Sequence, residues 1–378
     1  MNDQLPPELV GTDLRLLTAT TRPPSSLLQK EGWRDFVNHQ RIEPPVRLDE
    51  SILQMWSKEK VARYKAIRKR YHAALPPLAT AALSKISDAV VRMSLTALDM
   101  PPGVRPGALI NGLPTLGKST VLLEAGRIYE RRMRQRLGLP EDADLDTEYI
   151  PVVYTTLSAE ETCKGLSTSL LNFYGETHSA NWSESKLSNE LARQAARSGT
   201  SLILIDDIHF LKAKVKQGMA VNTHLKSLMS RINATFAYAG VHVDRTGLLF
   251  EGQLEANAQA AQTQRRFKRF DMETFPGDLD ELKTVLAGLE KQLILLKARP
   301  GDLQGLAQYV QDRTDGYMGP IAALVREGAA LAIDGGQERL SKSLLDAVTL
   351  DHASEKRFEQ LNPSQESGAD LKTLPSVS

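Results

Sequence analysis

One stretch of this sequence, from Gly112 to Thr120, limits the possible folds more than any other. Apolar residues that favour a strand precede it at 107–111, and an apolar-faced segment that favours a helix follows it at 121–136. Between them the chain matches the pattern G-x-x-x-x-G-K-[ST], with the residues Gly112, Leu113, Pro114, Thr115, Leu116, Gly117, Lys118, Ser119 and Thr120. In this context the pattern predicts a loop whose backbone N–H groups surround phosphate oxygens at a helix N-terminus.

The residues of this loop suit a nucleoside triphosphate bound together with a divalent cation. Lys118 supplies a positive charge for the β- and γ-phosphates, and the Ser119 hydroxyl is a hard oxygen ligand for Mg²⁺. Unpaired N–H groups and the helix dipole favour phosphate at the same end of the helix. The alternative is a chance loop with a solvated lysine, which the flanking strand and helix argue against. We therefore predict ATP and Mg²⁺ as cofactors.

Five patterns, including the one before the loop, predict the strands of a sheet. They lie at 107–111, 149–156, 201–206, 234–241 and 266–272. Helical segments separate them, which favours βαβ crossovers, and the third is an apolar run of the kind that parallel sheets bury on both faces. The predicted fold class is α/β, with a parallel five-stranded sheet in a P-loop core, a helical extension before it and a helical lid after it.

Changes in composition predict where the chain divides. Prolines punctuate the first 50 residues, Pro76 and Pro77 separate two helices in the basic segment that follows, and helical spacing resumes after Pro276. The last residues are too polar to recover the entropy lost on ordering. We expect an extended arm at 1–50, a basic helical region at 51–99, the core at 100–275, a helical lid at 276–355 and a flexible tail at 356–378.

Two aspartates follow the apolar run LILI, where a buried strand emerges at the edge of the sheet. Open α/β sheets bind ligands at this edge, so we expect Asp206 to hold Mg²⁺ through water. In P-loop hydrolases the next acid orients or deprotonates the attacking water, which is the role predicted for Asp207. Glutamate is more usual there, and the shorter aspartate predicts slow turnover. The alternative for Asp207 is a helix N-cap or a surface acid.

Three further residues are candidates for the same site. Arg265 and Arg266 precede the last predicted strand, and a guanidinium from another subunit could neutralise charge on the transferred phosphoryl group. The alternative is a solvated basic strand edge, since Lys268 and Arg269 follow. His242, after the fourth predicted strand, is a candidate γ-phosphate sensor, although a histidine at a strand end is more often structural.

Three basic clusters could bind DNA phosphates without reading bases. The formal net charge is only +1, so such binding must come from local patches. The clusters are Lys212, Lys214 and Lys216 after the aspartates; Lys58, Lys60, Arg63, Lys65, Arg68, Lys69 and Arg70 in the basic helical region; and Arg131, Arg132, Arg134 and Arg136 at the end of the helix after the loop. The helix dipole and nearby acids explain the third best, and an ordinary solvated face is the alternative for each.

The bulk composition indicates a soluble globular protein. Apolar residues make up 41% of the chain, enough for a sizeable core, and Cys163 is the only cysteine. No apolar run reaches the roughly 18 residues that a membrane span needs. The start MNDQLPPELV does not resemble a signal peptide. We expect a cytoplasmic protein without a membrane partner.

Several segments, in order along the chain, are similar to one known family. GLPTLGKST, LILIDDIHFL, YAGVHVDRTGLL and AQTQRRF, with MWSKEKVARYKAIRKRYHAAL upstream, resemble the TniB family of transposition ATPases over about residues 28–355. This family belongs to the AAA+ class, as do the TnsC and MuB proteins. The resemblance implies an AAA+ fold and an ATP-dependent homo-oligomer, ring or filament, that assembles on duplex DNA and recruits or activates an integrase-like transposase.

The resemblance also implies roles for single residues. Nucleotide would lie between protomers, which makes Arg266 a trans arginine finger and Arg265 its neighbour and rival. Two positions depart from the related pattern. Gly319 stands where related lids carry a sensor arginine, and Val241 follows Gly240 where a small polar residue is usual.

Two other functions stay open from the sequence. A signalling or scaffold P-loop NTPase would bind ATP and a protein partner but not DNA, and the salt dependence of duplex binding separates the two readings. A secretion-associated ATPase of a related AAA+ branch is the third reading, and the lack of a membrane span or peptidoglycan-binding repeat argues against it. In the first reading ATP drives assembly, and hydrolysis then disassembles the oligomer.

Overall fold

The structure is a computed structural model that describes residues 25–78, 80–101, 103, 105–140, 148–159, 161–210, 216–243, 266–275 and 279–361, without the side chains of 216–219 and 222. The chain forms two compact units. The sheet unit comprises residues 20–40 and 79–273, and the helical unit comprises residues 1–19, 41–78 and 274–378.

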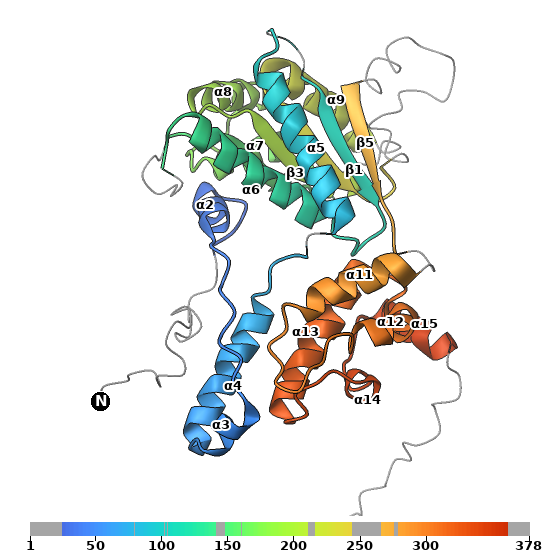
Figure 1. Ribbon diagram of the computed structural model, residues 1–378. Helices are drawn as coiled ribbons and strands as arrows, with labels where there is room; N and C mark the ends of the chain where they lie inside the picture. Colours follow the sequence, from blue (N-terminus) through green and yellow to red (C-terminus); the bar gives the residue numbers. More distant parts are fainter. Residues whose placement is uncertain are drawn as a thin grey trace, which may run out of the picture. The chain divides into compact units, whose positions relative to one another are not determined.

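The sheet unit is built on five parallel strands in the order β2-β3-β4-β1-β5 (Figure 1). The strands are β1 (Gly107–Gly112), β2 (Val152–Thr156), β3 (Leu202–Asp206), β4 (Thr235–Gly240) and β5 (Phe267–Met272). β3 and β4 are buried along their whole length, as expected for apolar strands inside a parallel sheet. The predicted five-stranded parallel sheet and the α/β fold class are confirmed.

The sheet unit also contains helices that precede the first strand or connect later ones. They are α2 (Lys30–Asn38), α5 (Ala81–Leu98), α6 (Lys118–Arg136), α7 (Cys163–Phe173), α8 (Glu184–Arg197), the short η3 (Ile208–Phe210) and α9 (Lys216–Arg231). α5 and α6 pack against each other and on one face of the sheet (Figure 1). The side chains of Thr80, Thr162 and Ser183 accept hydrogen bonds from the first turns of α5, α7 and α8, which fixes where these helices begin.

The helical unit combines two distant parts of the chain. Its elements are α3 (Glu50–Gln54), α4 (Lys58–Ala73), α11 (Leu279–Glu290), η5 (Gln304–Leu306), α12 (Ala307–Thr314), α13 (Met318–Asp334), α14 (Lys342–Leu345) and α15 (His352–Leu361). One apolar core joins all of these except α15, with Tyr64 and Ile67 of α4 among leucines such as Leu282 and Leu286 of α11. In neither unit does a described helix have the length and apolar character to cross a membrane.

The boundaries of the two units differ from the domain boundaries predicted from composition. The expected basic helical region at 51–99 is split, because α4 buries its apolar side chains in the helical unit whereas α5 belongs to the sheet unit. The expected extended arm at 1–50 contains α2, whose Trp33 and Val37 are fully buried. The expected tail from 356 begins inside α15, and residues 362–378 lie outside the described part of the chain.

Candidate nucleotide site and basic surfaces

The predicted phosphate-binding loop joins the end of β1 to the start of α6. Gly117 has φ 93° and Thr115 has φ 59°, both in the left-handed region, so the loop curls before the helix begins at Lys118. A Cβ on Gly112 would lie 2.6 Å from the carbonyl oxygen of Met272 in β5, so only glycine fits this close approach. The first N–H groups of α6 have no carbonyl partner inside the helix, which leaves them for an anion.

Lys118 points back along its own loop. Its side chain is only 8% exposed, and Nζ donates a hydrogen bond to the Leu113 carbonyl at 2.5 Å. Burial lowers the pKa of this ammonium group, and the carboxylates of Asp206 and Asp207 oppose that shift. An ammonium group has three donors, so a phosphate placed in the loop would find both charge and N–H groups at this point.

Asp206 ends β3 and is 4% exposed. Burial raises the pKa of its carboxyl group, and a hydrogen bond with the Ser119 side chain opposes that shift. The Asp207 N–H donates to Oδ1 at 2.8 Å, and the Tyr154 hydroxyl donates to Oδ2 at 3.3 Å. The Ser119 hydroxyl and the Asp206 carboxylate thus meet at one point. Two hard oxygen donors beside a phosphate loop are a donor set that fits Mg²⁺.

Asp207 follows in a left-handed turn, with φ 53°. Aspartate tolerates this conformation better than most residues. Its carboxylate is 45% exposed, accepts a hydrogen bond from Thr156 Oγ1 at 3.0 Å, and lies 3.8 Å from His209 Nδ1. The side chain is therefore held by the end of β2 while remaining open to solvent, a geometry that allows it to contact a water molecule.

Asn111, the residue before the loop, joins the ends of three strands and was not recognised from the sequence. Its side-chain amide donates to Asp271 of β5 at 2.7 Å, and its oxygen accepts from the Val243 N–H at 3.0 Å, just after β4. His242 precedes that N–H, is exposed and has φ 45°. It lies at the carboxyl end of the sheet, as its predicted role requires, and that role stays a prediction.

Arg266 lies at the other end of the sheet. It is exposed and directly precedes Phe267, which pairs with Gly107 at the start of β1. The phosphate loop follows the other end of β1, about 17 Å away at about 3.3 Å per residue of strand. The register therefore separates Arg266 from the phosphate loop of its own chain. Arg265 lies outside the described residues.

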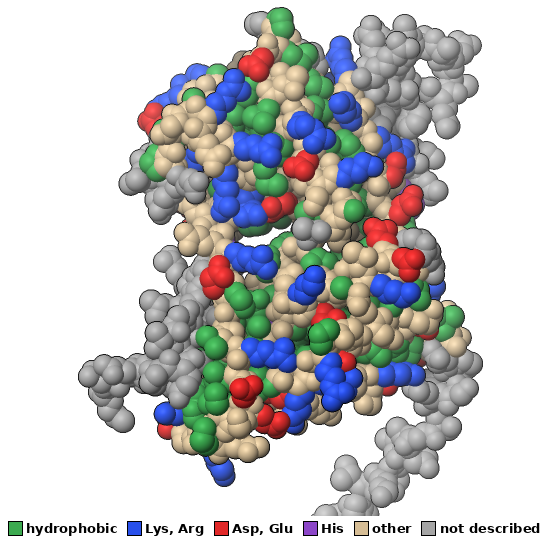
Figure 2. Space-filling model, viewed as in Figure 1, with side chains coloured by type: hydrophobic (Ala, Val, Ile, Leu, Met, Phe, Trp, Pro, Cys, Tyr) green, Lys and Arg blue, Asp and Glu red, His purple; other side chains and the backbone are tan. Residues whose placement is uncertain are grey.

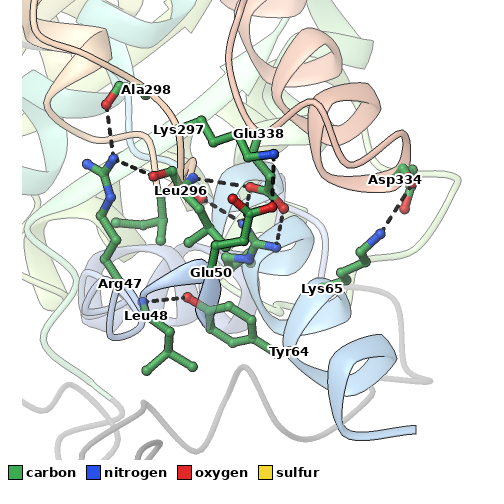
Figure 3. A network of polar contacts seen from close by, with 12 residues as sticks. Arg47, Leu48, Glu50, Tyr64, Lys65, Leu296, Lys297, Ala298, Asp334 and Glu338 are labelled. Carbon is green, nitrogen blue, oxygen red and sulfur yellow. Dashed lines mark hydrogen bonds and ion pairs between the residues drawn. The ribbon is translucent and has the colours of Figure 1, made fainter. Parts of the chain in front are cut away.

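The basic residues of α4 are largely engaged inside the helical unit (Figure 3). Arg68 is fully buried and forms two hydrogen bonds with Glu338, at 2.6 and 2.8 Å. Lys69 pairs with Asp334 at 2.8 Å, and Lys65 donates to the Asp334 carbonyl at 3.3 Å. This second predicted DNA cluster therefore includes side chains that hold α4 against the C-terminal helices.

The arginines at the end of α6 are also engaged. Arg134 is buried and pairs with Glu130 at 2.9 Å, Arg131 donates to the Val37 carbonyl at 2.6 and 3.1 Å, and Arg136 pairs with Asp99 at 3.2 Å. The helix dipole and nearby acids were the expected explanation for this cluster, and residues 141–147 of the acidic stretch lie outside the described residues. In the structure, specific acceptors on α2, α6 and the end of α5 hold three of the four side chains.

Other basic side chains remain on the surface of the sheet unit. Figure 2 shows lysine and arginine side chains over the face that α5 and α6 cover, and Lys85, Arg92 and Arg132 of these helices are exposed. Lys212 and Lys214 lie outside the described residues. Lys216 begins α9, but its side chain is among those not described. The first predicted DNA cluster therefore stays a prediction from sequence.

Comparisons with known proteins bear on this geometry. A family model described as "Bacterial TniB protein" matches residues 81–276. The chain is similar to the ORC2 protein of Aeropyrum pernix in ADPNP-ADP complexes, with 13% identity and a TM-score of 0.56, over 75% of this chain and 72% of that one. It is also similar to the ORC1 protein of the same organism in complex with DNA, with 14% identity and a TM-score of 0.53, over 77% of this chain and 68% of that one.

No curated protein matches the sequence. At identities this low, similarity to the two solved structures shows a shared fold. The positions of the phosphate loop, Asp206 and Asp207 at one edge of the sheet come from this chain's own structure and do not depend on those similarities.

Proposed function

Because this chain belongs to the TniB family, we propose that it is an AAA+ ATPase that regulates DNA transposition. The observation that carries this proposal is the meeting of Lys118, Ser119 and Asp206 at the carboxyl edge of a parallel sheet. A bound nucleotide would place its phosphates against the start of α6, and Ser119 with Asp206 would hold Mg²⁺ beside them. Mg²⁺ would neutralise charge on the phosphates during transfer.

Asp207 is proposed to orient the attacking water. Its carboxylate is held by Thr156 yet remains nearly half exposed, which suits a group that must contact water. Because aspartate is one methylene shorter than glutamate, alignment of the water is expected to be less favourable, and we propose slow hydrolysis.

We propose that the active form is a homo-oligomer with nucleotide between subunits. The strand register supports this, because Arg266 stands about 17 Å of strand away from the phosphate loop of its own chain. A neighbouring copy is therefore the partner whose nucleotide Arg266, or its neighbour Arg265, would contact. ATP would stabilise the interface, and hydrolysis would weaken it.

We propose that Lys212, Lys214 and Lys216 contact DNA phosphates. Support for this choice is that Arg68, Lys69 and three of the four arginines at the end of α6 are engaged with partners inside their own units. The DNA-bound oligomer would then recruit or activate an integrase-like transposase. The cytoplasmic location remains a prediction.

Duplex binding measured with ATP, with ADP and without nucleotide tests this proposal. Lys118→Ala should weaken ATP affinity by about 10- to 100-fold, the effect of removing hydrogen bonds to charged groups. It should abolish the ATP dependence of DNA binding, whereas the exposed control Lys283→Ala in the helical unit should leave both unchanged. Nucleotide-independent DNA binding would contradict the assembly switch. ATP binding without DNA binding at any salt concentration would favour a protein-binding scaffold.

A further inference from the structure

Helix α2 buries the large side chain of Trp33 in the sheet unit. Trp33 is 1% exposed, and its indole Nε1 donates to Glu130 Oε2 on α6 at 2.6 Å. A Cβ added to Gly126 of α6 would lie 2.7 Å from the indole ring, so glycine makes the space that the ring occupies. These residues fix the indole against the helix that begins at the phosphate loop. α2 itself lies outside the segment that the family model matches.

The indole is also stacked on Tyr154 of β2. The two ring centroids lie 6.2 Å apart with an interplanar angle of 17°. The Tyr154 hydroxyl in turn donates to Asp206 Oδ2 at 3.3 Å. Three side chains in contact thus lead from α2 to the carboxylate that is proposed to hold Mg²⁺.

The end of α2 is fastened as well. Arg131 donates two hydrogen bonds to the Val37 carbonyl, and the Val37 side chain is fully buried. Glu130, which accepts the indole hydrogen bond, is itself buried and paired with Arg134. A helix held at its middle and at its last turn restricts the position of Trp33, and a stacked neighbour restricts the Tyr154 ring.

We propose that α2 is a positioning element for the magnesium site, in which Trp33 holds Tyr154 and Tyr154 holds the Asp206 carboxylate in the orientation that meets Ser119. This inference rests on the proposed ATP and Mg²⁺ function and adds a part of the chain that precedes the AAA+ core. Residues that hydrogen-bond to a metal ligand orient it, and their loss typically weakens metal binding. By linkage, anything that displaces α2 should weaken Mg²⁺ binding, and Mg²⁺ should stabilise docked α2.

Tyr154→Phe tests the hydroxyl while it keeps the aromatic stack. The Mg²⁺ concentration needed for half-maximal tight ADP binding should rise about tenfold. This is the size of effect typically seen when a residue that hydrogen-bonds to a metal ligand is removed. ADP affinity without Mg²⁺ and the thermal midpoint should stay close to those of the parent. Tyr149→Phe is a matched control, because the Tyr149 hydroxyl is buried and has no partner among the described residues. An unchanged Mg²⁺ requirement in Tyr154→Phe would overturn the inference.

Trp33 fluorescence tests the link to α2. The chain has three tryptophans, and Trp56→Phe with Trp182→Phe leaves Trp33 as the sole indole. Adding Mg²⁺ to the ADP-bound protein should change the Trp33 emission, and Tyr154→Phe should reduce that change. If ADP binds in a Mg²⁺-dependent manner but Trp33 does not respond, α2 is not coupled to the site. If the parent protein binds no adenine nucleotide, the proposed ATPase function fails as well.

Discussion

Helices α4 and α6, one in each unit, are both rich in lysine and arginine but use them differently. In α4, basic side chains are held by Asp334 at the end of α13 and by Glu338 in the connection that follows, with Arg68 fully buried against Glu338. In α6, the basic end is held by Glu130 and other acceptors, whereas the opposite end presents Lys118 to the phosphate loop. One helix thus has a structural role along its length, and the other combines a structural end with a functional one.

This difference shows that a run of positive charge in a sequence does not define a nucleic-acid surface. Available charge depends on acids far away along the chain, and Glu338 lies 270 residues after Arg68. The contrast can be tested by removing partners of α4 and asking whether stability or binding changes.

The largest expected effect comes from Glu338→Gln. The substitution keeps the shape of the side chain but leaves the buried Arg68 without a counter-charge, which typically costs about 3–5 kcal/mol. The free energy of unfolding from urea denaturation, followed by circular dichroism, measures this loss.

Asp334→Asn is the matched control for Glu338→Gln. It removes the ion-pair partner of Lys69, which is next to Arg68 on α4. The Lys69 and Asp334 side chains are 39% and 54% exposed, so the expected loss is less than about 1 kcal/mol. Equal losses in the two variants would show that the buried pair contributes no more than an exposed one. The double variant Arg68→Met with Glu338→Leu should recover much of the lost stability.

The second effect is a pH dependence that originates in α4. His72 is 1% exposed, and its Nε2 accepts the Ile294 N–H at 2.9 Å. Burial lowers the His72 pKa from 6.5 to about 4, and the nearby Arg68 acts in the same direction. Because the folded pKa lies below the unfolded one, the unfolded chain takes up the proton first. Stability should be full above pH 6.5 and fall as pH decreases toward 4, by about 2 kcal/mol at pH 5.

His72→Gln isolates this contribution. Glutamine can still accept the Ile294 N–H but does not titrate, so the difference in unfolding free energy between parent and variant should shrink or change sign as pH falls from 7 to 5. A constant difference over that range would mean that the folded protein accommodates protonated His72.

The smallest effect is expected for DNA binding by Lys69→Ala. Its ammonium group is already paired with Asp334, so duplex affinity should change by less than about twofold. Replacing Lys212, Lys214 and Lys216 together with alanine provides the contrast, and should lower the slope of log affinity against log salt by about 2–3, close to 0.9 per phosphate contact. A large loss of duplex affinity in Lys69→Ala would indicate that α4 contacts DNA.

Much of the sheet unit was predictable because its signals are local. The ends of four strands lie within one residue of the predicted segments, β2 begins three residues later than predicted, and the loop from Gly112 to Ser119 joins β1 to α6 as its pattern predicts. Apolar runs, glycines and the strand-loop-helix order act over a few residues, so a single sequence is enough to read them.

The remaining features depend on contacts between distant residues. Nothing near Trp33 indicates that it packs on Tyr154, although Gly126 inside an otherwise helical pattern is a sign of close packing. Asn111 is one polar residue at a strand end, and its role becomes visible only when β4 and β5 lie beside β1. The assignment of α4 and α5 to different units likewise depends on which distant apolar side chains each helix packs against.

The long separation between Arg68 and Glu338 also affects biosynthesis. At about 5–20 residues per second, Glu338 leaves the ribosome roughly 15–50 s after Arg68. Throughout that interval the arginine of α4 has no counter-ion, and until α11 and α13 have been made the apolar side of the helix has no cover. Every strand of the sheet unit, by contrast, has been made by Met272. A message truncated shortly after Met272 would therefore yield a chain with all five described strands and an α4 without its packing partners.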